Sequence, residues 1–265
     1  MTHSTLDSGD WLVPVWPAPK QVRAVCTTRS GGVSLPPYDS LNLGTHVGDG
    51  ASAVANNRDR LRQALGARPV FLNQVHGTDA VELGCDTPDG GSADGVYTRA
   101  RGLACTIMMA DCLPVLLCDA RGQKVAAVHA GWRGLAGTGG TGVLEQVLKQ
   151  FRPLALVDNN DEAPDLIAWL GPCIGPLAFE VGADVREAFT HDNPKAQACF
   201  VPQPSGKWLA NLPALARQRL AASGVTRVFG NDGSAPWCTV GNPLRFFSHR
   251  RDGVSGRMAA CIWLE

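Results

Sequence analysis

Two histidines and one cysteine end or follow apolar runs: His76 in VFLNQVHG, Cys112 in MADCLP and His129 in VAAVHAGWRG. Each run then meets a Gly or Pro, which predicts that the three side chains lie at the ends of buried strands. Two imidazoles and one thiolate suit zinc, with copper as a second ion that such donors bind, and three ligands leave a fourth tetrahedral position open. The chain has no CxxC pair of the kind that builds structural zinc sites. The sequence therefore predicts a catalytic zinc site.

Each of these residues also has a simpler interpretation when it is considered alone. A histidine after an apolar strand is often a packed core residue, and a single cysteine often behaves as a small buried hydrophobe. The shared context favours function, because polar groups on a rigid scaffold reach the surface where strands give way to turns.

Two glycine-rich segments carry an arginine that could hold an anion. In TTRSGGVS, Arg29 precedes Gly31 and Gly32, whose N–H groups could approach phosphate or carboxylate while the guanidinium binds it. The alternative is a hairpin turn with a solvated arginine. In AGWRGLAGTGG, five glycines lead into a predicted helix whose N-terminus could face an anion, and Arg133 follows His129 by four residues. Both interpretations stay open.

Length, charge and cysteine content limit the class of protein. The chain has 265 residues and 45% hydrophobic content, enough for a substantial core, and one domain over 1–265 is the better prediction. The 24 basic and 24 acidic residues cancel without a basic block, so we expect no nucleic-acid partner. No apolar run approaches membrane-spanning length, and the first residues lack a signal-peptide pattern. Nine irregularly spaced cysteines fit a reducing compartment, so we expect a cytoplasmic protein without a membrane partner.

Apolar runs and their periodicity predict a mixed α/β chain. The expected strands are 23–28, 70–75, 103–110, 115–119, 125–130, 166–171, 225–230 and 258–264. The expected helices are 52–65, 140–151, 183–189 and 212–222. The most polar stretch, 157–164, is predicted to be a surface loop rather than a domain linker.

Long motifs in a fixed order resemble those of a known family over nearly the whole chain. They are TTRSGGVSLPPYDSLNLGTHVGD at 27–49, NR at 57–58, NQVHG at 73–77, ADG at 93–95, ADCLPVLLCD at 110–119, VHAGWRGLAGTG at 128–139, LGPCIGPLAFEVG at 170–182 and FFSHRRDGVSGRMAACIWL at 246–264. By these motifs the chain resembles the YfiH-like proteins, also called laccase-domain or multicopper polyphenol oxidase family proteins. The resemblance implies zinc ligation by His76, Cys112 and His129, and an α/β fold with mixed sheets flanked by helices. His249 stands where the family usually has Tyr, which changes a pocket contact and not the metal site.

The resemblance also implies a function. It implies phosphorolysis of adenosine, inosine and methylthioadenosine, with adenosine deaminase activity, so the expected partners are purine nucleosides and phosphate. Phosphorolysis needs cationic donors that hold phosphate below the sugar. The candidate residues are Arg29, Ser30, Arg133 and Arg250. Deamination needs an activated water, which zinc with an open position can supply. Asp111 and His46 are candidates for proton transfer, although a turn-capping carboxylate and a packed histidine fit these positions equally well.

Other functions also fit these residues. YfiH-like folds resemble cysteine hydrolases of the glutamine-deamidase kind, in which Cys112 would be the nucleophile and His129 its base. A thiolate held by zinc is a poor nucleophile, so this reaction and the zinc site exclude each other. Polyphenol oxidation ranks low, because six histidines cannot build several copper sites. The last alternative is a zinc-stabilised module that binds nucleosides without turnover.

Overall fold

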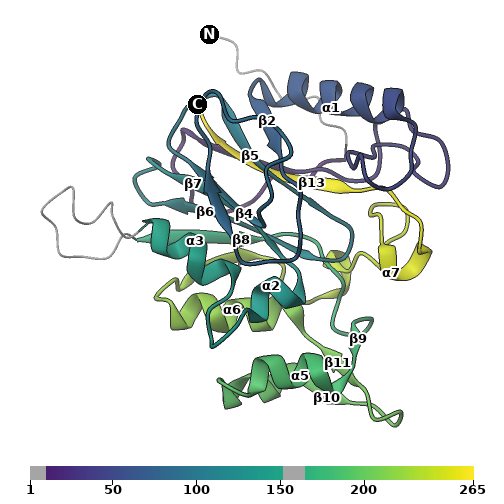
Figure 1. Ribbon diagram of the computed structural model, residues 1–265, viewed down its shortest axis with the longest axis vertical. Helices are drawn as coiled ribbons and strands as arrows, with labels where there is room; N and C mark the ends of the chain where they lie inside the picture. Colours follow the sequence, from purple (N-terminus) through teal and green to yellow (C-terminus); the bar gives the residue numbers. More distant parts are fainter. Residues whose placement is uncertain (1–9, 152–164) are drawn as a thin grey trace, which may run out of the picture.

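Two β-sheets packed face to face, with helices on both outer sides, form the body of the protein in our computed structural model (Figure 1). The structure describes residues 10–151 and 165–265. The layers are the helix α1 (Ala51–Leu65), a four-stranded sheet, a six-stranded sheet and a second group of helices. A three-stranded sheet lies beyond these helices, at the end of the molecule furthest from α1 (Figure 1).

The four-stranded sheet has the order β1–β13–β5–β2 and mixes antiparallel with parallel pairs. Its strands are β1 (Val22–Cys26), β13 (Met258–Leu264), β5 (Leu103–Met109) and β2 (Arg68–Phe71). β13 pairs antiparallel with β1 and β5, whereas β2 runs parallel to β5. Because β2 and β5 are parallel, the segments that follow them, with His76 and Cys112, leave the sheet at the same edge.

The six-stranded sheet has the order β12–β8–β6–β7–β4–β3 and is also mixed. Its strands are β12 (Arg227–Gly230), β8 (Leu166–Leu170), β6 (Leu113–Asp119), β7 (Val125–Ala130), β4 (Gly95–Thr98) and β3 (Ala80–Glu82). β6 and β7 pair antiparallel, with Pro114 opposite His129. The start of β6, which follows Cys112, therefore lies beside the end of β7 that carries His129.

Side chains alternate along the central strands and so fill the spaces on both sides of each sheet. In β5, Cys105, Ile107 and Met109 pack in the core between the two sheets. Ala104 and Met108 of the same strand pack in the core under α1. β6 and β7 alternate in the same way between the sheet interface and the helices opposite. Strands that are buried on both faces appear in the sequence as continuous apolar runs.

Helices cover the outer face of the six-stranded sheet. They are α2 (Trp132–Ala136), α3 (Val143–Phe151) and α6 (Leu212–Ala222), whose apolar side chains share one core with that sheet. The remaining elements are β9 (Glu180–Val181), α5 (Ala183–Thr190), η1 (Pro194–Cys199), β10 (Phe200–Pro202), β11 (Trp208–Ala210), η2 (Ala235–Trp237) and α7 (His249–Asp252). Within the described ranges, no helix combines the length and apolar character needed to cross a membrane.

The predicted α/β class with mixed sheets flanked by helices is confirmed, and every predicted strand and helix is present. The largest differences lie at two ends, and the other ends agree within two residues. β2 ends at Phe71 instead of 75, and α3 begins at Val143 instead of 140. Gly140 has a φ of 72°, which a right-handed helix cannot accommodate. The shortest elements, such as β9 and α7, were missed because they are too short to show a period. The predicted loop at 157–164 lies outside the described residues.

The buried side chain of Asn57 fastens the loop that follows β1 to helix α1. Its Nδ2 donates to Ser34 Oγ at 2.9 Å, to Ser40 O at 3.2 Å and to Asn42 O at 2.9 Å. Its Oδ1 accepts from the backbone N–H of Val33 at 2.9 Å. One side-chain amide therefore supplies hydrogen-bond partners to a loop that has little regular secondary structure.

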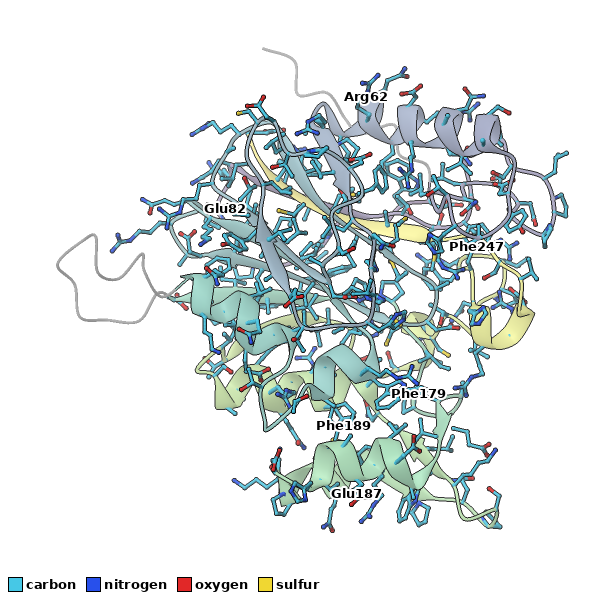
Figure 2. The ribbon with its side chains drawn as sticks, in the orientation of Figure 1. Arg62, Glu82, Phe179, Glu187, Phe189 and Phe247 are labelled. Carbon is cyan, nitrogen blue, oxygen red and sulfur yellow. The ribbon has the colours of Figure 1, made fainter. Side chains whose placement is uncertain are left out.

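Replacing Asn57 by Ala is expected to lower the free energy of unfolding by about 2–4 kcal/mol, because several buried polar groups would lose their partners. Arg62→Ala on the same helix is the matched control. Arg62 lies on the outer face of α1 (Figure 2) and is 61% exposed, so its loss should change stability by about 0.5 kcal/mol or less. Chemical denaturation measures both values, and equal effects would contradict the structural role of Asn57.

Candidate metal centre

His76 is positioned by an extension of the β2–β5 pairing beyond the end of β2. The side-chain amide of Gln74 donates to Met108 O at 2.7 Å and accepts from Met108 N at 2.8 Å. The Gln74 side chain thus makes the two hydrogen bonds to β5 that the backbone of a paired strand residue would make. His76 then turns sharply, with a positive φ of 60°.

Cys112 occupies the tight turn between β5 and β6. The residue before it, Asp111, has a φ of 94°, which is uncommon for any residue other than glycine. Such a conformation costs about 1–3 kcal/mol and persists where surrounding contacts hold it. The turn directs Cys112 toward the end of β7, with its Sγ 3.7 Å from His76 Nε2.

Asp94, just before β4, joins both histidines. Its Oδ1 lies 2.7 Å from His129 Nδ1 and accepts from the backbone N–H of His76 at 3.0 Å. Its Oδ2 accepts from the N–H groups of Val75 at 3.1 Å and Gly77 at 2.7 Å. A carboxylate on Nδ1 leaves Nε2 of His129 as the free ligand nitrogen, an arrangement typical of metal-bound histidines. Sequence reasoning assigned no role to Asp94, and its place in the ADG motif was the only signal.

The charges of the cluster favour an ionised thiol. Burial opposes ionisation of Cys112, but His129 and His76 beside it lower its pKa to about 6. Burial likewise opposes protonation of His129, but Cys112 and Asp94 raise its pKa to about 9. Burial also opposes ionisation of Asp94, yet the hydrogen bond from His129 and those from the backbone lower its pKa. A thiolate is the form of cysteine that binds metals and also the form that attacks as a nucleophile.

The geometry of the three side chains fits a tetrahedral ion. One ligand atom from each of His76, Cys112 and His129 lies within 4.8 Å of the other two. Tetrahedral zinc at its usual bond lengths separates a sulfur from a nitrogen ligand by about 3.6 Å, close to the 3.7 Å found between Cys112 and His76. Gly131 supports this arrangement, because a Cβ there would lie 2.9 Å from His76 Cδ2 and 3.1 Å from Cys112 Sγ.

The cluster opens into a cavity of about 570 Å³. Two histidines and two arginines share its walls with the ligands: His46, His249, Arg250 and Arg257. Apolar side chains cover much of the rest: Leu72, Met108, Trp132, Ile174 and Phe179. The structure thus brings the predicted residues His46 and Arg250 to the predicted ligands. It adds Arg257, whose only signal in the sequence was its place in the last family motif.

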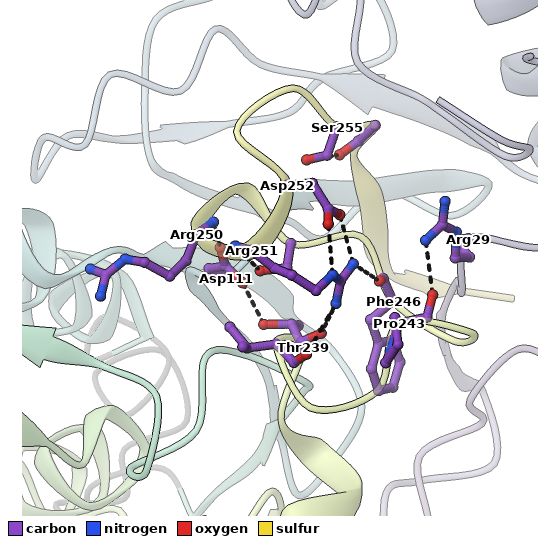
Figure 3. Close-up of polar contacts among 12 residues, drawn as sticks. Arg29, Asp111, Thr239, Pro243, Phe246, Arg250, Arg251, Asp252 and Ser255 are labelled. Atoms are coloured by element: carbon purple, nitrogen blue, oxygen red, sulfur yellow. Dashed lines mark hydrogen bonds and ion pairs between the residues drawn. The ribbon is translucent and has the colours of Figure 1, made fainter. Parts of the chain in front are cut away.

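Arg29 is partly buried among other residues and does not line the cavity. Its Nη1 donates to Pro243 O at 2.8 Å, and its Nη2 pairs with Asp39 Oδ1 at 3.1 Å (Figure 3). Its guanidinium carbon lies 4.7 Å from the centre of the Phe247 ring. These contacts favour the structural interpretation of Arg29 over the predicted role in phosphate binding. The neighbouring Ser30 is likewise absent from the cavity walls.

Arg133, in the glycine-rich run, is also placed away from the cavity. Arg133 is exposed, lies 4.7 Å from the Trp132 ring centre and does not line the cavity. Two glycines of the run, Gly134 and Gly137, permit close backbone packing. A Cβ at Gly134 would lie 2.5 Å from Gly77 O, and one at Gly137 would overlap the carbonyl oxygen of Thr141.

Asp111 lines the cavity, but both of its carboxylate oxygens are already engaged. Oδ1 accepts from Thr239 Oγ1 at 2.5 Å, and Oδ2 accepts from the backbone N–H of Arg250 at 2.6 Å (Figure 3). A carboxylate occupied in this way is poorly placed to carry protons to a substrate. The geometry therefore supports the turn-holding interpretation of Asp111 over the predicted proton transfer.

Gly131→Ala is expected to abolish zinc binding while the protein stays folded. Gly131 has φ −63° and ψ 154°, which alanine adopts readily, so the added methyl group would disturb only the ligands. Zinc per chain, measured by elemental analysis after loading and desalting, tests this. Gly50→Ala is the matched control, since Gly50 has φ −61° and ψ 123° and faces open space. Full zinc content in Gly131→Ala would contradict ligation by these three residues.

Comparison with known sequences places this site in a family context. Residues 23–265 match the family described as "Multi-copper polyphenol oxidoreductase laccase". The chain is 50% identical over 255 residues to "Purine nucleoside phosphorylase YfiH" of Escherichia coli (strain K12), covering 96% of this chain and 98% of that protein. It is 49% identical over 257 residues to a Pseudomonas aeruginosa protein also named as a purine nucleoside phosphorylase, with coverage of 96% and 98%.

Solved structures give the same relationship. A Neisseria meningitidis protein superposes with a TM-score of 0.84 at 46% identity, covering 97% of this chain and 99% of its own. YlmD from Geobacillus stearothermophilus superposes with a TM-score of 0.79 at 30% identity, covering 93% of each chain. From residue 23 to its last residue, this chain belongs to the multi-copper polyphenol oxidoreductase laccase family, the group of YfiH-like proteins.

Proposed function

We propose that the protein is a metal-dependent purine nucleoside phosphorylase acting on adenosine, inosine and methylthioadenosine. The observation that carries this proposal is one cavity of about 570 Å³ that holds His76, Cys112 and His129 together with Arg250 and Arg257. Cavities of this size are typical of sites for small ligands. The name of the relatives, purine nucleoside phosphorylase, supports the reaction.

The two arginines are the proposed phosphate-binding groups, because their guanidinium forks match phosphate oxygens. Arg250 reaches from α7 toward β9, where its Nη1 donates to Glu180 O at 3.1 Å. Arg257 donates from Nη1 to Ser255 O at 2.9 Å. Each guanidinium is thus anchored on one side by backbone carbonyls. The apolar walls formed by Met108, Ile174 and Phe179 suit the face of a purine.

His46 is the proposed proton-transfer group. Burial and the positive charges of Arg257 and Arg58 lower its pKa, so the imidazole is neutral at pH 7. A neutral imidazole carries one N–H donor and one acceptor nitrogen, which permits proton exchange with a leaving purine.

The proposed metal is zinc, with copper as the alternative for the same donors. When bound it would supply a Lewis acid with an open position, the chemistry needed for the proposed adenosine deaminase side activity. Asp94 would orient His129 toward it, and Gly131 would leave room for it. The proposed partners are free nucleosides and phosphate, without membrane or nucleic acid. All nine cysteines are unpaired in the described part of the chain, which supports a cytoplasmic location.

A cysteine hydrolase or deamidase is the second candidate. Cys112, His129 and Asp94 stand in the order of nucleophile, base and orienting carboxylate, and the Cys112 pKa of about 6 favours a thiolate. Polyphenol oxidation has less support, since one His/Cys group is the only candidate metal cluster in the described ranges. A nucleoside-binding module without turnover would share the cavity and differ only in lacking products.

The purified protein is expected to hold about one zinc per chain, because the three ligands form an open tetrahedral site. Cys112→Ala should lose most of this zinc, since it removes the charged ligand. Cys85→Ala, which removes an exposed cysteine outside the site, is the control and should keep it. Elemental analysis measures the content. Active wild-type protein that is free of metal and is inactivated by alkylation of Cys112 would favour the hydrolase instead.

Phosphate should separate the two proposed activities. With phosphate, adenosine should yield adenine and ribose 1-phosphate, because phosphate is the sugar acceptor. In phosphate-free buffer, release of adenine should stop while conversion to inosine continues, because deamination uses water. Chromatography of the products measures both reactions.

The Cys112→Ala protein, purified in parallel, is the control for contaminating enzymes and should form neither product. Release of adenine at an undiminished rate without phosphate would overturn phosphorolysis. Absence of inosine at full zinc content would remove the deaminase activity and leave the metal an orienting role.

A further inference from the structure

The Asp111 carboxylate joins three segments that are far apart in the sequence. It precedes Cys112 in the turn between β5 and β6, and it accepts hydrogen bonds from Thr239 and from the first turn of α7 at Arg250 (Figure 3). Its own backbone carbonyl accepts from Ile174 N at 2.9 Å. One buried residue thus connects the ligand turn to the segment that carries the cavity arginine.

The Thr239 hydroxyl donates a hydrogen bond to Asp111 and makes no other hydrogen bond within the described part of the chain. Its backbone is held separately, because its N–H donates to Cys173 O at 2.9 Å and its carbonyl accepts from Arg251 Nη1 at 2.7 Å. Arg251 also donates to Phe246 O at 3.0 Å and pairs with Asp252, which closes this loop on itself (Figure 3). Thr239 is fully buried, so its hydroxyl would be costly without an acceptor. Its position is therefore set by the backbone, and its hydroxyl is directed at Asp111.

A second arginine, Arg257, lines the same cavity as Asp111 and Cys112. Within the described ranges, no ion pair joins Arg257 to Asp111. The guanidinium of Arg257 is held instead by the carbonyl groups of Ser255 and Gly256, at 2.9 and 3.1 Å from Nη1, and lines the cavity.

We propose that Thr239 is a positioning residue that acts through Asp111. Its hydroxyl holds the carboxylate, so that Cys112 stays in its turn and Arg250, whose backbone N–H donates to the same carboxylate, stays in place at the cavity. The effect on the metal ligand stands on the hydrogen bonds alone, whereas the effect on phosphate rests on the proposed function.

Thr239→Val and Thr239→Ser are the matched pair that tests this, since valine keeps the shape and serine keeps the hydroxyl. In Thr239→Val, loss of zinc to a chelator should be about tenfold or more faster, as for other residues that support metal ligands. The KM for inorganic phosphate should rise by about ten- to a hundredfold, the value of a charge-assisted hydrogen bond. The KM for nucleoside should stay within about twofold. Thr239→Ser should behave as the wild type in all three measurements.

Two outcomes would overturn the proposal. One is wild-type zinc retention and phosphate KM in a Thr239→Val protein that melts at the wild-type temperature. The other is a Thr239→Ser protein as impaired as Thr239→Val, which would assign the effect to packing. If valine prevents folding, Thr239→Ala against Thr239→Ser isolates the same hydroxyl. A wild-type protein without phosphorolysis would count against the proposed function alone, because chelator extraction measures the positioning without substrate.

Discussion

The hydrogen bonds of one buried carboxylate, Asp94, are the constraint on which the candidate site depends. Asp94 is fully buried, and an ionised carboxylate is tolerated there only because four donors surround it. Three of them are consecutive backbone N–H groups around His76, and the fourth is the ring of His129. The same carboxylate therefore shapes the irregular segment after β2 and sets the orientation of a side chain on β7. Both histidines are therefore held in place by one side chain that belongs to neither β2 nor β7.

The sheets explain why such a junction can form. The parallel pair of β2 and β5 brings two chain segments out at one edge, and the β6–β7 hairpin places a third beside them. The two sheets belong to different layers, so the ligands meet where the layers meet. Gly131 and Gly134 make this approach close enough, because a side chain at either position would strike the ligands or the turn at Gly77. The two glycines therefore belong to the geometry of the site.

The arginines divide into structural and cavity groups, and their local partners decide the division. Arg29 forms an ion pair with Asp39 and lies against the ring of Phe247, so its charge is balanced by groups of the protein itself. Arg250 and Arg257 are anchored by backbone carbonyls, which do not neutralise them. A chain with no net charge can therefore still present positive potential in one cavity. The proposed phosphate site follows from this local imbalance and not from composition.

Local sequence was sufficient for the residues whose signal lies within one segment. The apolar runs predicted the strands, the strand-to-turn positions predicted His76, Cys112 and His129 as ligands, and the motifs predicted the family. The roles of Asp94, Thr239 and Arg257 were not predictable in this way, because each depends on partners from other elements. The same reason explains why the sequence left the roles of Arg29 and of the glycine-rich run open. A guanidinium beside glycines has the same local pattern whether it faces an anion or an internal carboxylate, and only the packed structure decides between them, because hydrogen bonds form between neighbours in space.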